Sequence, residues 1–132
     1  MAASPVLADS SYYIALLRRG EDPLRALALA AATRDLAVSG IIRCEVGRGL
    51  VHPKVRQNFN DFWDVMIQVP TDNHLWEEVE ETLWGLDRKG CTLPLPDVVI
   101  ACSAKRIGAV VLTFDDHFKK IPGVRVVDLL QY

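Results

Sequence analysis

The sequence has few cysteines and no long hydrophobic run. Its three cysteines, Cys44, Cys91 and Cys102, form no C-x-x-C pair, which argues against a zinc or redox motif. No stretch reaches the roughly 18 apolar residues of a membrane span, and residues 1–5 lack the basic and apolar regions of a signal peptide. We therefore expect a cytoplasmic protein with reduced, mostly buried thiols that does not associate with a membrane.

The sequence also has no large excess of positive or negative charge. Fifteen Lys and Arg residues stand against seventeen Asp and Glu residues, a net charge of −2, which excludes the basic coat of many duplex-binding proteins. There is no glycine-rich phosphate loop and no Ser, His and Asp set typical of hydrolases. Half of the 132 residues are hydrophobic, enough to bury a core, so we predict a single domain over residues 1–132.

Short apolar runs alternate with segments of helical periodicity along the whole chain. We predict strands at 6–8, 36–38, 109–113 and 124–127, an extended piece at 68–70, and helices around 13–17, 23–31, 41–50, 53–67, 72–89 and 97–107. Strands that alternate with helices are typical of a parallel α/β sheet covered on both faces. Ligands of such sheets bind beyond the carboxyl ends of the strands, so the residues there are candidates for function.

Acidic residues stand at these positions. Asp9 directly follows the first predicted strand, and Glu45 lies nearly two turns into the helix after the second. Asp97 begins a helix, and Asp115 and Asp116 follow the strand that ends near residue 113. Carboxylates that converge are ligands for Mg²⁺ or Mn²⁺, which can activate water for hydrolysis of a phosphodiester. Taken singly, each acid also fits a helix cap, a turn or a surface position.

The segments around these acids resemble, in order, the four acidic motifs of PIN-domain ribonucleases, and most closely those of VapC-like toxins from toxin–antitoxin pairs. The segments are VLADSS (6–11), VSGIIRCE (38–45), LPLPDVVIA (93–101) and LTFDDHF (112–118). The resemblance extends over almost the whole chain. It implies a three-layer α/β/α domain around a short central parallel sheet.

The resemblance also implies roles for individual residues. Asp9, Glu45, Asp97 and Asp115 would bind Mg²⁺ or Mn²⁺, and the activated water would cut single-stranded RNA. Asp116 is the alternative to Asp115 as the fourth acid, and His117 stands where family members often have a second Asp. Supporting hydroxyls would come from Ser10 and Thr113. The resemblance further implies a homodimer and a cognate antitoxin protein.

The basic residues suggest where RNA could bind. Arg43 and Arg48 share the predicted helix of Glu45, so we expect them to contact phosphate groups, although surface solubility explains them about as well.

Two other functions fit parts of the pattern. One is a PIN-fold interaction protein without catalysis, against which the four intact acids argue. The other is a different Mg²⁺-dependent phosphoryl-transfer domain, such as a receiver or a haloacid-dehalogenase-like phosphatase. The phosphatase usually carries a second Asp two residues after its nucleophilic Asp, and Ser11 occupies that place here. A receiver needs a Lys after a late strand, and the sequence offers none at a persuasive position.

Overall fold

Five short parallel strands form one sheet in the computed structural model, which describes residues 3–128. The strands are β1 (Val6–Ala8), β2 (Leu36–Ser39), β3 (Ile67–Val69), β4 (Val110–Leu112) and β5 (Val126–Val127). Their order in the sheet is β3-β2-β1-β4-β5, and every pair of neighbours is parallel. The predicted α/β class with a parallel sheet is therefore confirmed.

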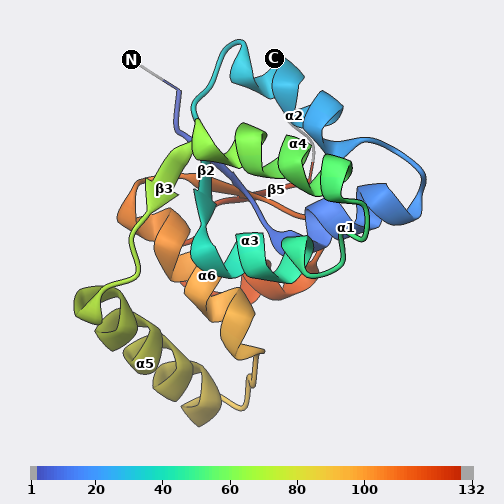
Figure 1. The fold of residues 1–132 in the computed structure, drawn as a ribbon. Coiled ribbons are helices and arrows are strands. Elements are labelled where there is room, and N and C mark those ends of the chain that lie inside the picture. Colours follow the sequence, from blue (N-terminus) through green and yellow to red (C-terminus); the bar gives the residue numbers. More distant parts are fainter. Residues whose placement is uncertain (1–2, 129–132) are drawn as a thin grey trace.

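Helices cover both faces of this sheet (Figure 1). They are α1 (Ser10–Arg18), α2 (Pro23–Ala31), α3 (Gly40–Gly47), α4 (Pro53–Asp64), α5 (Asn73–Arg88) and α6 (Leu95–Arg106), with a short 3-10 helix, η1 (Asp116–Lys120), after β4. Figure 1 shows α2 and α4 on one side of the strands and α5 on the other, where it packs against α6. The predicted three-layer arrangement is confirmed.

The direction of the chain reverses at the middle of the sheet. The chain moves from β1 outward through β2 to β3, then returns through α5 and α6 to β4 on the other side of β1. Right-handed crossovers place the helices of the two halves on opposite faces. The connections that leave the carboxyl ends of β1 and β4 therefore diverge, which leaves an opening where ligands bind in folds of this kind.

The core explains why the strands are continuously apolar. All three residues of β1 and of β4 are buried, and α6 is buried on nearly all sides from Val98 to Ala104. On the other face, Trp63 of α4 is buried and donates a hydrogen bond from Nε1 to the hydroxyl of Tyr13 on α1, at 3.2 Å. This buried pair fixes α4 against α1.

Several boundaries differ from the predictions. Ile67, predicted as the end of a helix, begins β3 because it pairs with Ala37 of β2. The third helix ends at Gly47 rather than near Leu50. Asp97 does not begin α6 but lies in its first turn, because the helix starts two residues earlier, at Leu95.

Two further features concern the expectations about thiols and membranes. Cys102 is buried as expected, whereas Cys44 is exposed, so the expectation of a buried thiol is wrong there. Within residues 3–128, no helix has the length and apolar character that crossing a bilayer requires.

Candidate metal site

Three side chains from separate elements converge beyond the carboxyl end of β4. Asp97 comes from the first turn of α6, Asp115 from the loop after β4, and His117 from η1. The Nδ1 atom of His117 lies 3.0 Å from Oδ2 of Asp97 and 3.4 Å from Oδ1 of Asp115. One potential ligand atom from each residue lies within 4.8 Å of the other two. We call these three residues the metal cluster.

The spacing within the metal cluster fits a small divalent cation. Adjacent ligands of an octahedral ion with bonds of about 2.1 Å lie about 3.0 Å apart. The two separations of 3.0 and 3.4 Å in the structure are close to this value. Two carboxylates and an imidazole can therefore act together as ligands of one ion with little rearrangement.

Asp115 is fixed by its own loop. Its backbone N–H donates to Oγ1 of Thr113 at 2.9 Å, and its Oδ1 accepts from the backbone N–H of His117, also at 2.9 Å. Asp116, by contrast, is exposed and forms an ion pair with Lys119 at 3.1 Å. The structure thus brings Asp115 into the metal cluster and leaves Asp116 outside it.

Asp9 lies at the end of β1, where its backbone N–H donates to the carbonyl of Leu112 on β4 at 3.1 Å, and it is not one of the three residues of the metal cluster. Its Oδ1 caps α1 by accepting from the backbone N–H of Tyr12 at 3.1 Å, and its Oδ2 accepts from the hydroxyl of Ser11 at 2.8 Å. Only 2% of Asp9 is exposed, and this burial raises the pKa of its carboxyl from the ordinary 3.8 to about 6. The hydroxyls of Ser11 and Thr113 and the backbone N–H groups of Ser11 and Tyr12 lower this pKa, but burial outweighs them.

Glu45 is fixed by Ser10. The Ser10 hydroxyl, predicted as a supporting group without a named partner, donates to Oε1 of Glu45 at 2.6 Å. The pKa of Asp97 is raised, mainly by burial and then by the negative charges of Asp115 and Glu45, against the lowering effect of its hydrogen bond to His117. A cation between these acids would relieve that repulsion.

Ser11 connects Asp9, at the end of β1, with Thr113, at the end of β4. It donates to Asp9, and its hydroxyl lies 3.3 Å from that of Thr113, which accepts from the backbone of Asp115. Sequence reasoning did not assign a role at the site to Ser11, and it left the role of His117 open. The signal for Ser11 was its position two residues after a helix-capping Asp, where a hydroxyl readily reaches the carboxylate.

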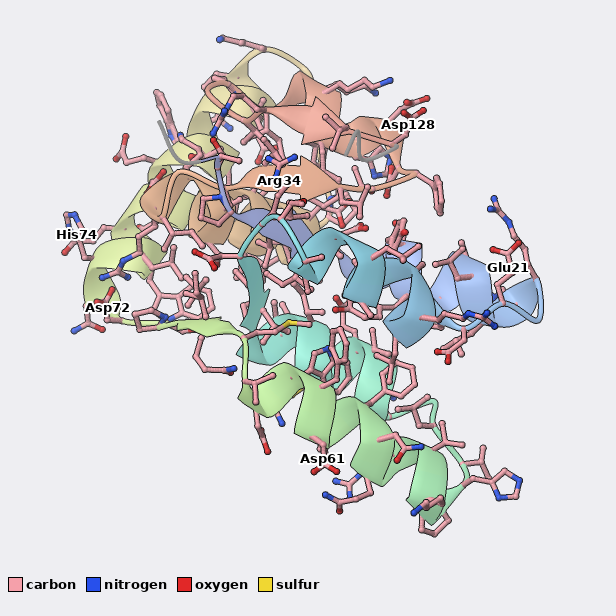
Figure 2. All side chains as sticks on the ribbon, turned by 90° about the horizontal axis from the view of Figure 1, so that it is seen from above. Glu21, Arg34, Asp61, Asp72, His74 and Asp128 are labelled. Carbon is pink, nitrogen blue, oxygen red and sulfur yellow. The ribbon has the colours of Figure 1, made fainter. Side chains whose placement is uncertain are left out.

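Within residues 3–128, no other group of three potential ligand side chains converges in this way. Glu21 and Asp61 are exposed and point outward from the periphery of the molecule (Figure 2), whereas Asp128, also exposed, lines a small pocket with Asp115 and Asp116. The convergence of Asp97 and Asp115 is therefore a particular feature of the edge of the sheet beyond β4.

A groove of about 740 Å³ adjoins the metal cluster. Asp115 and His117 line it together with two cationic side chains, Arg18 of α1 and Lys120 of η1. The exposed ring of Phe114 also lines it and stacks on Tyr12, with ring centroids 5.1 Å apart.

The two arginines that the sequence suggested as phosphate contacts line a different groove. Arg43 and Arg48 lie there with Arg56, in a space of about 450 Å³ that shares no lining residue with the groove of Asp115. The guanidinium of Arg43 forms an ion pair with Asp64 at 3.0 Å and lies over the ring of Trp63. Packing between α3 and α4 accounts for this arginine without a phosphate.

The fold and this cluster define an α/β protein with an acidic centre at the switch point of its sheet. The model of the PIN domain family matches residues 6–124, and the chain belongs to this family. Among curated proteins, no sequence is similar enough to count as a relative.

Solved structures share the fold. A chain of the DNA-bound VapBC complex from Salmonella typhimurium is 21% identical with a TM-score of 0.75, over 95% of this chain and 98% of the other. VapBC2 from Rickettsia felis, bound to a promoter DNA fragment, gives 20% identity and a TM-score of 0.74, over 93% and 97%. A toxin–antitoxin complex from Klebsiella pneumoniae gives 24% and 0.64, over 96% and 99%. At these identities the likeness establishes the fold.

Proposed function

We propose that this protein is a metal-dependent endoribonuclease that cleaves phosphodiester bonds of single-stranded RNA. The observation that carries the proposal is the convergence of Asp97, Asp115 and His117, with distances of 3.0 and 3.4 Å from Nδ1 to the two carboxylates. Asp9 and Glu45 are each hydrogen-bonded to a serine hydroxyl, and the charge of Glu45 acts on Asp97.

The proposed chemistry needs no protein nucleophile. Mg²⁺ or Mn²⁺ held by Asp97 and Asp115 would supply Lewis-acid chemistry, which would make a water molecule more acidic and offset the negative charge of the phosphodiester. Asp97 and Asp115 hold the ion, with Asp9 and Glu45 contributing negative charge and ligand oxygens. Ser10 holds Glu45, and Thr113 fixes the backbone of Asp115. These supports keep the acids in place when substrate oxygens enter the coordination shell.

The groove beside the metal cluster is the proposed path of the RNA. Arg18 and Lys120 line it, and their positive charges suit backbone phosphates next to an acidic centre. Contacts from Arg43 and Arg48 stay a prediction, and on this geometry they would involve a second stretch of RNA outside the groove of Asp115.

We also propose that the protein is the toxin of a toxin–antitoxin pair. Structural neighbours are VapBC complexes from several bacteria, which supports a cognate antitoxin as partner. The proposal includes a homodimer and action in the cytoplasm, where cellular RNA lies. An interaction protein that has lost catalysis is the alternative, and the intact acids at the edge of the sheet favour the nuclease.

The test is cleavage of a labelled single-stranded RNA and of the matching DNA by the purified protein. Reactions with Mg²⁺, with Mn²⁺ and with EDTA are compared for the wild type, Asp97→Asn and Asp115→Asn. Asp87→Asn is the matched control, because Asp87 is an exposed residue of α5. We expect metal-dependent cleavage of RNA that both cluster variants lose and that the control keeps.

Other results would contradict parts of the proposal. Cleavage that persists in EDTA or in both cluster variants would refute the metal site. A preference for the DNA would refute the substrate class. A stronger loss in Asp116→Asn than in Asp115→Asn would show that the fourth acid is Asp116. Neither cleavage nor metal binding would favour the inactive interaction protein.

A further inference from the structure

The imidazole of His117 contacts both carboxylates of the metal cluster. Its Nδ1 atom is 3.0 Å from Asp97 and 3.4 Å from Asp115, so the ring points between them. The 3.0 Å contact with Asp97 is a hydrogen bond, and the 3.4 Å approach is to the same Oδ1 of Asp115 that accepts from the backbone N–H of His117. The backbone that carries the ring is anchored, because the next residue, Phe118, is fully buried and holds η1 in the core, while the His117 side chain itself is 43% exposed.

Nitrogen and oxygen ligands favour different cations. Mg²⁺ prefers oxygen ligands, holds its water shell strongly and accepts imidazole poorly. Divalent transition metals accept imidazole nitrogen readily, and their affinity for mixed nitrogen and oxygen sites rises from Mn²⁺ along the first row. A site with two carboxylates and one imidazole is therefore better suited to a transition metal than a site made of carboxylates alone.

We propose that His117 is a metal ligand through Nδ1 and that this nitrogen makes the site select Mn²⁺ over Mg²⁺. The inference rests on the metal binding in the proposed function and adds a ligand and a selectivity to it. Coordination requires an Nδ1 without hydrogen, so the hydrogen of the neutral ring lies on Nε2 in the loaded protein. Asp97 and His117 would then each bind the ion, in place of their present hydrogen bond to each other.

The competing role for His117 is to donate an Nδ1–H hydrogen bond that positions Asp97. Asparagine separates the two roles, because its side-chain amide can donate from about the place of Nδ1 but provides no imidazole nitrogen. His117→Asn therefore keeps a donor for the positioning contact and removes the imidazole nitrogen, so any ligand atom left at this position is an oxygen. His74→Asn is the matched control, because His74 is an exposed residue of α5 whose ring lies 3.9 Å from Glu77.

The first measurement is the affinity for Mn²⁺ and for Mg²⁺ by titration calorimetry. We expect the wild type and His74→Asn to bind Mn²⁺ more tightly than Mg²⁺. Removal of a group that only hydrogen-bonds to a metal ligand typically lowers metal affinity roughly 10- to 100-fold. Loss of the nitrogen ligand itself in His117→Asn should therefore weaken Mn²⁺ binding by about tenfold or more. Mg²⁺ binding should change much less, so the ratio of the two affinities falls. In His117→Asp the ratio should fall as well, through tighter binding of Mg²⁺.

The second measurement is spectroscopic and needs no catalysis. Electron spin-echo envelope modulation of the Mn²⁺-loaded protein detects a directly bound ¹⁴N nucleus. We expect this modulation in the wild type and in His74→Asn, and its loss in His117→Asn. Circular dichroism and a thermal melt establish that each variant is folded, and His117→Asp provides a second test of selectivity.

The outcomes separate this inference from the proposed function. Mn²⁺ binding without ¹⁴N modulation, together with an unchanged affinity ratio in His117→Asn and His117→Asp, would overturn the role of His117 and leave the metal site intact. A wild type that binds neither ion would overturn the proposed function itself. A ¹⁴N modulation in the wild type together with equal affinities for Mn²⁺ and Mg²⁺ would overturn the proposed selectivity and keep His117 as a ligand.

Discussion

Replacement of Asp9 by Asn should make the metal-free protein more stable while it weakens metal binding. Asp9 is a buried carboxylate whose pKa is raised to about 6 by its burial. Asn carries no charge, and its side-chain oxygen can still accept from the backbone N–H of Tyr12. The variant therefore keeps the cap of α1 and removes the cost of a buried charge.

The size and pH dependence of this effect follow from the pKa. The pKa of Asp9 is higher in the folded protein than its ordinary value of 3.8. The stability that protonated Asp9 contributes is therefore complete below pH 3.8 and is lost as the pH rises through about 6. A difference of about two pH units corresponds to about 3 kcal/mol in the free energy of unfolding. The advantage of Asp9→Asn over the wild type should thus grow from about pH 4 and level off above pH 7.

The assay is urea unfolding of the two proteins in EDTA at several values between pH 5 and pH 8, followed by the fluorescence of the buried Trp63. Titration with Mn²⁺ then measures how much each protein is stabilised by the ion, and the wild type should gain more. A difference in unfolding free energy that does not change with pH, or a variant less stable than the wild type at pH 8, would refute the reasoning.

Two further substitutions test the contacts that hold the site and the core. Ser10→Ala removes the 2.6 Å hydrogen bond to Glu45 and should lower metal affinity roughly 10- to 100-fold by calorimetry, while Ser10→Thr, which keeps the hydroxyl, should lose much less. Equal affinities in the two variants would contradict a positioning role for that hydroxyl. Tyr13→Phe leaves the buried Nε1–H of Trp63 without its acceptor and should cost about 1–3 kcal/mol of stability in urea unfolding. An unchanged midpoint would show that this hydrogen bond contributes nothing.

Much of the architecture was predictable because it depends on local sequence. Helix starts follow from capping residues such as Asp22, followed directly by Pro23, and Asp72, whose side chain accepts from Leu75 N–H at 3.0 Å. The apolar strands were recognisable because both faces of the sheet are covered, so their residues are continuously hydrophobic. The expected closeness of Asp9 and Asp115 depended on β1 and β4 being parallel neighbours, which the sheet confirms.

Elsewhere, tertiary contacts outweighed the local pattern. Ile67 continues the helical periodicity of α4, yet it belongs to β3 because β2 offers its backbone a partner. Two prolines obscured the start of α6: Pro94 is its N-cap and Pro96 lies in the first turn, where the missing N–H costs nothing. The helix therefore starts before the acid that the sequence took as its beginning.

The sequence by itself determined the order of strands and helices, the caps, and the four acidic positions, because these depend on residues a few places apart. Only the tertiary structure decided which side chains meet. His117 and Asp97 are 20 residues apart, and their 3.0 Å contact exists because α6 docks beside β4 and the buried Phe118 holds η1 in place. Likewise, α4 holds Arg43 through Asp64 and Trp63, away from the groove of Asp115. Such distances follow from how elements pack, which no spacing along the chain encodes.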